Sequence, residues 1–438
     1  MRYELAGKRV LVAGMAKSGF AAVDVLLKHG AKVRAMDSKP DESMRARLAE
    51  RGVELEGQSP EAFLGADLIV LSPGVPVEAV PQGAAPVIGE VELAGYDLQG
   101  PVIGITGSNG KTTTTALIGH ILDNSGIACQ VGGNIGTAPA AMIGASRPDQ
   151  WNVLELSSFQ LETIHEFRAK VGLVLNVTQN HLDRHRTIEN YANAKARLLE
   201  TQDESCFAVL NRDNSITASM AGRTRGQVVW FSMKTPVERG FWRHGDEIRS
   251  DSGPLMSIGE IRLRGLHNVE NVMAAAAACQ IAGATHEQIR AAVMTFQGVE
   301  HRIEFVRTLT GVDYYNDSKA TSVDAALKAI DAFPGGLWII LGGKDKGSDY
   351  TVMREPLRAK AKAALLIGAA APKIEKHLAG AIELVQCGDI ARAVEVGHRR
   401  AAAGDTVLLA PACASFDQFR SFEHRGETFK ELVRGLKE

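Results

Sequence analysis

The sequence predicts an α/β protein of three domains, each built on its own sheet. The chain has 438 residues, enough for about three domains at roughly 150 residues each. Short β-rich apolar runs alternate with helical stretches along the chain, a pattern typical of parallel sheets covered by helices. Apolar residues make up 45% and charged residues 23%, which is typical of soluble globular proteins and argues against a disordered, collagen-like or coiled-coil chain.

Charge and cysteine usage narrow the function classes. The 49 Lys and Arg residues nearly balance the 51 Asp and Glu residues, so we expect neither nucleic acid nor an anionic membrane as a partner. The five cysteines are odd in number and never spaced as C-x-x-C, which argues against a disulfide framework or a thiolate zinc site. The N-terminus lacks the apolar core of a signal peptide, and no apolar run approaches the roughly 18 residues of a membrane span. The sequence therefore predicts a cytoplasmic protein.

The first domain, residues 1–95, is predicted as a Rossmann-like βαβαβ unit. Its second strand ends at Asp37, about where dinucleotide-binding folds place the acid that bonds the ribose. Ala16 stands where their fingerprint has its second glycine, which argues against a nicotinamide or flavin and leaves open a nucleotide bound in another way. The expected strands cover 9–13, 32–37 and 67–72, and the expected helices cover 18–29 and 42–51.

The second domain, residues 96–298, is predicted to hold a parallel sheet of the P-loop ATPase type. It follows a Pro- and Gly-rich stretch at 73–89 and opens with a strand at 101–106. Further strands are expected at 151–156, 171–177, 206–210 and 228–231, and helices are expected from about 113 and at 188–202, 268–281 and 286–296.

The segment TGSNGKT at residues 106–112 is the strongest functional signal. A strand, a glycine-rich turn and a helix N-terminus together present backbone N–H groups and a helix dipole to phosphate oxygens. Lys111 would neutralise the charge of β- and γ-phosphates, and Thr112 could bind Mg²⁺. Ile105 stands where the usual P-loop has its first glycine, so a turn without a ligand is the alternative interpretation.

Two further pairs of residues in the central domain point toward a nucleotide. Glu155 and His181 each follow an expected buried strand, at the edge where parallel sheets bind ligands, and could hold Mg²⁺ there. Hydrogen-bonded structural roles are the alternative. Asn268 and Asn271 are three residues apart on one helical face, from which their amides could bond a nucleotide. For Asn268 a helix N-cap is the alternative.

The third domain, residues 299–438, repeats the alternation and is predicted as a second Rossmann-like sheet. The segment NDSKATS at 316–322 follows a strand and precedes a helix, for which Ser322 is the expected cap. Strands are expected within 303–315 and at 337–341, 363–367, 382–387 and 406–410, and helices at 322–333 and from about 418.

On these motifs the chain resembles the Mur ligase family, ATP-dependent amide-forming enzymes of peptidoglycan synthesis. Segment 106–112 looks like the family's own P-loop variant, and the resemblance spans all three domains. The motifs that follow in the family's order are GGNIG (132–136), ELSSFQL (155–161), NVTQNHLD (176–183), YANAKAR (191–197) and GLHNVEN (265–271). The segments NDSKATS (316–322), GGKDKG (342–347), LAPACASFDQF (409–419) and FEHRG (422–426) resemble the members that add D-glutamate.

The resemblance implies ATP and Mg²⁺ as cofactors, with two metal ions. It implies that ATP is bound by Gly107, Asn109, Gly110, Lys111, Thr112, Thr113, Asn268, Asn271, Arg302 and Asp317. The metal ligands would be Thr112, Glu155, His181 and a carbamylated Lys195. The UDP-linked precursor would contact Asp37, Ser38, Ser72, Asn134, Gln160 and His181, and D-glutamate would contact Thr321, Lys346, Ser415 and Phe422. The catalytic residues would be Lys111, His181 and Lys319.

Two segments depart from the family pattern. Met15–Lys17 differs from the commoner glycine-containing loop, which bears on the uridine contacts. Gln179 and Asn180 stand where acidic residues are frequent before the histidine, which removes charge beside the expected metal site.

The implied reaction is the phosphorylation of UDP-N-acetylmuramoyl-L-alanine by ATP, followed by attack of the D-glutamate amine on the acyl phosphate, in a monomer. Two other hypotheses stay open. A ligase like the folylpolyglutamate synthetases shares the P-loop but needs a pterin pocket, and testing D- against L-glutamate with each acceptor separates the two. A dinucleotide-sensing regulatory protein would use the P-loop for binding alone, and its phosphate release would not depend on either substrate.

Overall fold

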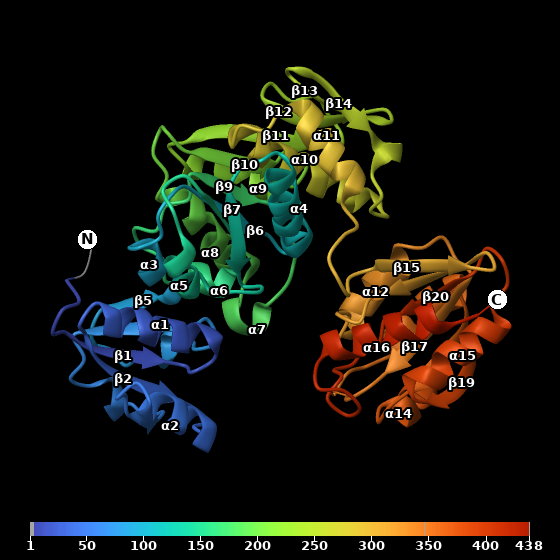
Figure 1. Ribbon diagram of the computed structural model, residues 1–438, viewed down its shortest axis with the longest axis horizontal. Coiled ribbons are helices and arrows are strands. Elements are labelled where there is room, and N and C mark those ends of the chain that lie inside the picture. Colours follow the sequence, from blue (N-terminus) through green and yellow to red (C-terminus); the bar gives the residue numbers. More distant parts are fainter. Residues whose placement is uncertain (1–3, 346, 438) are drawn as a thin grey trace. The chain divides into compact units, whose positions relative to one another are not determined.

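The computed structural model describes residues 4–345 and 347–437, and the chain divides into two compact units (Figure 1). The first unit comprises residues up to 261 together with 266–296, and the second comprises 262–265 together with the residues from 297 onward. Two sheets lie in the first unit and one in the second, so three α/β sheets follow one another along the chain. This confirms the predicted fold class.

The N-terminal sheet has the strand order β3-β2-β1-β4-β5, and its neighbouring strands are parallel. This is the order of a Rossmann-like unit, in which ligands bind beyond the carboxyl ends of the strands. Val10 and Val12 face one apolar core and Leu11 and Ala13 face another, because alternate side chains of a strand point to opposite faces. The elements are β1 (Arg9–Ala13), α1 (Lys17–Lys28), β2 (Lys32–Asp37), α2 (Glu42–Ala49), β3 (Leu55–Gly57), β4 (Leu68–Leu71), β5 (Val87–Gly89) and α3 (Glu90–Gly95).

The central sheet has nine strands in the order β14-β13-β12-β11-β10-β9-β6-β8-β7. It is parallel from β12 to β7 and antiparallel from β12 to β14. Its strands are β6 (Val102–Thr106), β7 (Cys129–Gly133), β8 (Trp151–Glu155), β9 (Val171–Val174), β10 (Phe207–Asn211), β11 (Gln227–Ser232), β12 (Gly240–His244), β13 (Glu247–Ser250) and β14 (Gly253–Ser257). Its helices are α4 (Lys111–Asn124), α5 (Pro139–Met142), α6 (Ser158–Leu161), α7 (Leu182–His185), α8 (Ile188–Glu200), α9 (Ser215–Ser219), α10 (Leu266–Ile281) and α11 (His286–Thr295). The strand that leads into the glycine-rich segment, β6, lies between β8 and β9.

The C-terminal sheet has the order β15-β16-β20-β17-β18-β19, parallel except for the pair β15 and β16. Its strands are β15 (Glu304–Leu309), β16 (Val312–Asn316), β17 (Leu337–Gly342), β18 (Ala361–Ile367), β19 (Glu383–Gly388) and β20 (Thr406–Leu409). Its helices are α12 (Val323–Asp331), α13 (Arg354–Lys360), α14 (Ala371–Leu378), α15 (Ile390–Arg400) and α16 (Phe422–Gly435). The central strands β16, β20 and β17 place the segments at 316–322, 342–345 and 409–419 at one edge of this sheet.

The structure also differs from the prediction at several elements. β5, β7 and the strands β12 to β14 were not predicted, and they lie at or near the edges of their sheets, where strands are shorter or less apolar. The last helix begins at Phe422 rather than near residue 418, because the Ser421 side chain accepts the backbone N–H of His424 and caps the helix there. Within 4–345 and 347–437, no helix is long and apolar enough to cross a membrane.

Candidate active site

The segment between β6 and α4 forms a rigid loop at a helix N-terminus. Asn176, which follows β9, accepts the backbone N–H of Asn109 on its side-chain oxygen at 2.8 Å and donates to the Asn109 carbonyl at 3.2 Å. Ser108 is held in the same way, because its hydroxyl donates to the Thr178 carbonyl and accepts the Thr178 N–H. The loop is therefore fixed before any ligand binds, at the positive end of a 14-residue helix.

Gly110 lies where a side chain would not fit. Its φ of 83° is in the left-handed region, and an added Cβ would lie 2.4 Å from the side-chain oxygen of Asn271. The amide of Asn271 in turn donates to Asn268 at 2.9 Å and accepts from the Thr114 hydroxyl at 3.3 Å. The two asparagines of α10 thus lie against the start of α4. Asn268 is the third residue of α10, so the alternative that it caps this helix is wrong.

The Lys111 side chain curls back over the loop. Lys111 is the first residue of α4, and its Nζ donates to the carbonyls of Gly107 at 2.8 Å and Ser108 at 3.3 Å. Thr112 and Thr113 follow in the first turn and are mostly buried. The predicted phosphate-binding residues of segment 106–112 therefore lie together at one helix end.

Lys195 is the residue whose setting differs most from its appearance in the sequence, where it would pass for a solvated helix charge. It lies on α8, is 1% exposed, and its Nζ donates to the Gly107 carbonyl at 3.0 Å and contacts the ring of Tyr191, 4.3 Å from the ring centre. Burial, with a smaller contribution from the nearby Lys111 ammonium, lowers the pKa of Lys195 well below its usual range. A neutral amine is therefore accessible to this side chain beside the phosphate loop.

Glu155 ends β8, the strand next to β6, and is 2% exposed. One carboxylate oxygen accepts the Asn134 side-chain amide at 2.9 Å. The other is buried and has no hydrogen-bond partner among the described residues. An ionised oxygen left unpaired inside a protein is costly, so this oxygen suits a hard cation as its partner. The Thr112 hydroxyl adds a second oxygen donor of the kind Mg²⁺ prefers, so this part of the predicted ligand set fits the ion.

His181 lies in the segment between β9 and α7, at a φ of 54°. It comes seven residues after β9 ends at Val174, further along the chain than expected because the strand stops three residues before 177, whereas Glu155 is the last residue of its strand rather than past it. Its exposed ring contacts Phe159 and Tyr191, with centroids 5.1 and 6.1 Å away. His181 therefore shares with Lys195 a contact to the Tyr191 ring.

In the N-terminal sheet, two predicted substrate residues hold the loop after β1. Asp37 accepts the backbone N–H of Met15 at 2.7 Å and of Lys39 at 2.8 Å, one on each carboxylate oxygen. The Ser72 hydroxyl donates to the Gly14 carbonyl at 2.6 Å. Ser38 is exposed beside them. The carboxylate that the sequence suggests as a ribose ligand thus also shapes the loop between β1 and α1.

A small hollow in the first unit brings Ser72 together with Gln160, and it is also lined by Glu162 and Arg184. Gln160 is the third residue of α6 and forms a capping box with Ser157, the residue before the helix. Its side-chain oxygen accepts from the N–H and the hydroxyl of Ser157. Its amide nitrogen is the part of the side chain that this box leaves to other partners. Arg184 and Glu162 form an ion pair at 2.6 Å that the sequence did not suggest.

In the second unit, Asp317 follows β16 and is 5% exposed. Its carboxylate accepts the Ile303 N–H at 3.3 Å. Burial raises the pKa of Asp317 to about 7, against the opposing effect of Arg302, this hydrogen bond and Lys319. The Lys319 N–H donates to the His301 carbonyl at 3.0 Å. The turn that carries Arg302 is therefore hydrogen-bonded to the segment that carries Asp317 and Lys319, and all three residues were predicted from the sequence.

The predicted amino-acid residues lie on neighbouring segments of the same unit. The Ala412 N–H donates to the Ala320 carbonyl at 2.9 Å, which joins the segment of Thr321 to that of Ser415. Ser415 is buried, and Phe422 opens α16 with its ring against His301. Lys346 lies outside the described residues.

Sequence reasoning missed the charges buried behind these loops. Arg425 is fully buried and donates to the hydroxyl and carbonyl of Ser318 and to the Cys413 carbonyl. Burial lowers the pKa of Arg425 to about 10. Lys430, one further turn along α16, is also buried. FEHRG marks the start of this helix, but burial of a charge depends on contacts more than 100 residues away and leaves no local signal.

Comparison with known proteins agrees with this geometry. Three family models match the chain in order: the MurD-like N-terminal domain of Mur ligases at residues 8–91, the Mur ligase middle domain at 105–279, and the Mur ligase glutamate ligase domain at 301–413. Proteins named UDP-N-acetylmuramoylalanine–D-glutamate ligase are 58% identical in Solibacter usitatus and 49% identical in Koribacter versatilis, each over 99% of both chains.

Two solved structures share the fold. The UDP-N-acetylmuramate-alanine ligase of Thermotoga maritima has a TM-score of 0.60 at 15% identity and covers 98% of this chain and 100% of its own. The MurF ligase of the same organism, solved in complex with ADP, has a TM-score of 0.60 at 20% identity and covers 99% of both chains.

Proposed function

The chain belongs to the Mur ligase family, and we propose that it is the ligase that adds D-glutamate to UDP-N-acetylmuramoyl-L-alanine in peptidoglycan precursor synthesis. ATP transfers its γ-phosphoryl group to the precursor carboxylate, and the D-glutamate amine then attacks the acyl phosphate and expels phosphate. The products are an amide, ADP and phosphate. The observation that carries the proposal is the full-length match to relatives with this name, together with the preformed phosphate loop of residues 107–112.

The cations of the site serve the transfer of the phosphoryl group. Lys111 lies at the loop that would hold the β- and γ-phosphates, and Lys319 faces the same anions in our proposal. Because phosphoryl transfer spreads negative charge over several oxygens, fixed cations lower its barrier more than covalent participation of the protein does. We assign ATP to Gly107, Asn109, Gly110, Lys111, Thr112, Thr113, Asn268, Asn271, Arg302 and Asp317.

The proposed metal ligands are Thr112, Glu155, His181 and Lys195. When bound, two Mg²⁺ ions supply charge neutralisation and alignment of the phosphate oxygens. The unpaired oxygen of Glu155 supports this assignment. Lys195 would join as a carbamate: its neutral amine attacks CO₂, a C–N bond forms and one proton leaves. The lowered pKa of Lys195 supports that step, because the protonated amine has no lone pair with which to attack.

His181 has a second proposed role. Its exposed ring on the Phe159 and Tyr191 cluster could orient the precursor or accept a proton from the attacking amine.

We assign the substrates to separate parts of the chain. Residues 1–95 bind the UDP-precursor, 96–298 bind ATP and 299–438 bind D-glutamate. The precursor contacts are Asp37, Ser38, Ser72, Asn134, Gln160 and His181, and the D-glutamate contacts are Thr321, Lys346, Ser415 and Phe422. The proposal includes a monomer that works in the cytoplasm. No observation favours a second function enough to set beside this one.

Stereospecific phosphate release tests the proposed substrates. With ATP, Mg²⁺ and UDP-N-acetylmuramoyl-L-alanine present, D-glutamate should support turnover and L-glutamate should not. Turnover with L-glutamate and a pterin acceptor instead would assign the chain to the folylpolyglutamate branch of these ligases.

A further inference from the structure

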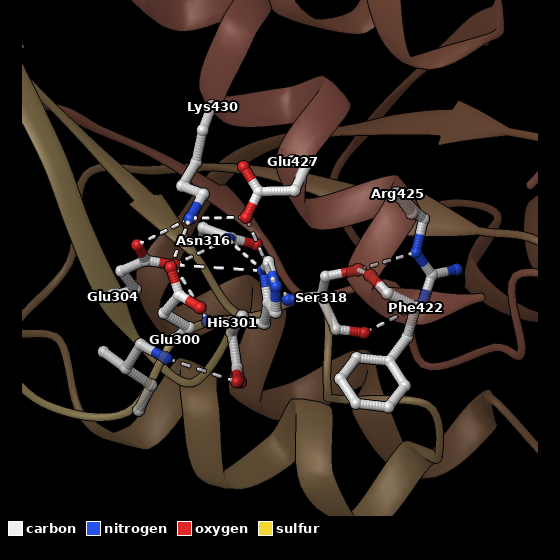
Figure 2. A network of polar contacts seen from close by, with 11 residues as sticks. Glu300, His301, Glu304, Asn316, Ser318, Phe422, Arg425, Glu427 and Lys430 are labelled. Atoms are coloured by element: carbon white, nitrogen blue, oxygen red, sulfur yellow. Dashed lines mark hydrogen bonds and ion pairs between the residues drawn. The ribbon is translucent and has the colours of Figure 1, made fainter.

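A cluster of charged side chains joins α16 to the segment that carries Glu300, His301 and Glu304 (Figure 2). The Lys430 ammonium is 2.8 Å from Glu427 and 3.1 Å from both Glu300 and Glu304. Its side chain is only 3% exposed. Burial alone would lower the pKa of Lys430, but the hydrogen bonds that its ammonium donates to the three carboxylates raise this pKa above its ordinary value. Lys430 is therefore a permanent cation that neutralises part of this carboxylate cluster.

Two of these carboxylates, Glu304 and Glu427, also contact His301. Glu304 accepts the His301 backbone N–H at 2.8 Å, and Glu427 lies 3.7 Å from its Nε2. Asn316 donates to both Nδ1 of His301 and Glu304, at 2.9 Å each. Figure 2 shows Lys430 and Glu427 extending from the helix, Glu427 toward the imidazole and Lys430 toward the carboxylates beside it. His301 is 4% exposed, so its ring is fixed on several sides.

Helix α16 fits closely against this ring. A Cβ at Gly426 would lie 2.1 Å from the His301 Nδ1, so only glycine allows the helix to approach this far. The Phe422 ring meets the imidazole edge-on at 6.1 Å. A displacement of α16 would therefore move His301 directly.

The turn around His301 is strained. His301 has a φ of 61° and Ile303 a φ of 44°, both in the left-handed region that residues with a Cβ rarely adopt. Arg302 lies between them and is partly exposed, whereas His301 points inward. Such a turn persists only when its surroundings hold it. The Ile303 N–H donates to Asp317, and the Lys319 N–H donates to the His301 carbonyl. Asp317 and Lys319 therefore depend on this turn for their position.

We propose that Lys430 is a positioning residue for the ligase reaction: by tying Glu300 and Glu304 to α16, beside Glu427 on the same helix, it holds the His301–Ile303 turn and so fixes Arg302, Asp317 and Lys319. Glu300, His301 and Glu427 have ligand atoms within 4.8 Å of one another, but the Lys430 ammonium already serves as the cation of this cluster. The inference rests on the proposed function, because that function assigns the three positioned residues to ATP and the transferred group.

The test compares Lys430→Met, which keeps the apolar stem, with Lys430→Arg, which keeps the charge. Lys376→Met, at an exposed position on α14, is the matched control. Steady-state phosphate release is measured with each substrate varied in turn, below the unfolding temperature of each variant. For Lys430→Met we expect kcat/KM for ATP and D-glutamate to fall by about tenfold or more, since small misplacements of aligned groups are costly. Lys430→Arg should recover most of this loss, and the KM for the UDP-precursor should stay within about twofold.

If Lys430 had only a structural role, Lys430→Met would lower the unfolding temperature but leave kcat and KM of the folded enzyme unchanged. That result would overturn the proposal. If Lys430→Met does not fold, Glu427→Gln tests the proposal instead, because it removes one charge that Lys430 contacts. Its control is Glu431→Gln, since Glu431 is exposed one turn further along α16. A fall of about threefold in the same kcat/KM values, confined to Glu427→Gln, supports the proposal, and parity with Glu431→Gln refutes it. A wild-type protein that releases no phosphate with D-glutamate would refute the proposed function instead.

Discussion

Replacing Glu155 by glutamine should separate stability from catalysis. Glutamine keeps the oxygen that accepts the Asn134 amide and replaces the unpaired oxygen by a neutral group, so no hydrogen bond of the described structure is lost. We therefore expect the free energy of unfolding of the metal-free protein to fall by less than about 1 kcal/mol, or to rise, because the unpaired buried oxygen is removed. In catalysis the variant lacks one negative charge in the proposed metal set. A loss of about 3 kcal/mol of transition-state stabilisation corresponds to a fall in kcat of about two orders of magnitude.

The assay pairs thermal unfolding without metal with phosphate release over a range of Mg²⁺ concentrations. Glu90→Gln is the matched control, because Glu90 is also buried and one of its oxygens has no hydrogen-bond partner within 4–345 and 347–437, but it has no assigned role. We expect the control to retain activity and Glu155→Gln to lose it while needing more Mg²⁺. Activity of Glu155→Gln within threefold of the wild type, at the same Mg²⁺ requirement, would refute the assignment of this oxygen to the metal.

The remaining predictions concern a buried carboxyl and the glycine of the phosphate loop. Burial raises the pKa of Glu90 to about 7 from an ordinary 4.5, so the stability that its protonated form contributes is complete below about 4.5 and is lost as the pH rises through 7. The free energy of unfolding of Glu90→Gln, relative to that of the wild type, should therefore rise by up to about 3 kcal/mol from pH 5 to pH 8 in denaturant unfolding. A difference between the two proteins that does not depend on pH would contradict this. Gly110→Ala should lose about 1–2 kcal/mol of stability to its left-handed φ and raise the KM for ATP, because its Cβ would displace Asn271. Gly126 is the control, because its φ is 71° but an added Cβ would meet no atom within 4 Å, so Gly126→Ala should lose stability without a change in the KM for ATP. Equal KM values for the two variants would argue against the clash of the Gly110→Ala side chain with Asn271.

The interior of each sheet could be predicted from the sequence, but the edges only in part: β15 and β19 were expected, whereas β5, β7 and β14 were not. Runs such as 10–13 and 337–341 are continuously apolar because these parts of their strands are buried on both faces. The strand β19 has a mixed burial pattern, and its prediction came from the alternation of elements rather than from its own composition. The strands β12 to β14 have no such support and were missed, because a sheet edge is defined by its neighbours.

The site could be predicted as far as its chemistry lies in contiguous segments. The phosphate loop carries its glycines, Lys111 and Thr112 within seven residues, so a pattern reveals them. Burial is different, because it is set by distant partners. Lys195 looks like an exposed helix charge until α8 is placed against the loop, and Arg425 meets Ser318 across 107 residues. The unpaired oxygen of Glu155 is likewise a property of the folded protein alone.

Phosphate release with each substrate omitted in turn, in the wild type and in Lys111→Ala, tests the central claim most directly. Our account predicts rapid release only when ATP, UDP-N-acetylmuramoyl-L-alanine and D-glutamate are all present, and a loss of at least about 100-fold in Lys111→Ala. Release that continues without both the precursor and D-glutamate, or full turnover in Lys111→Ala, would contradict it.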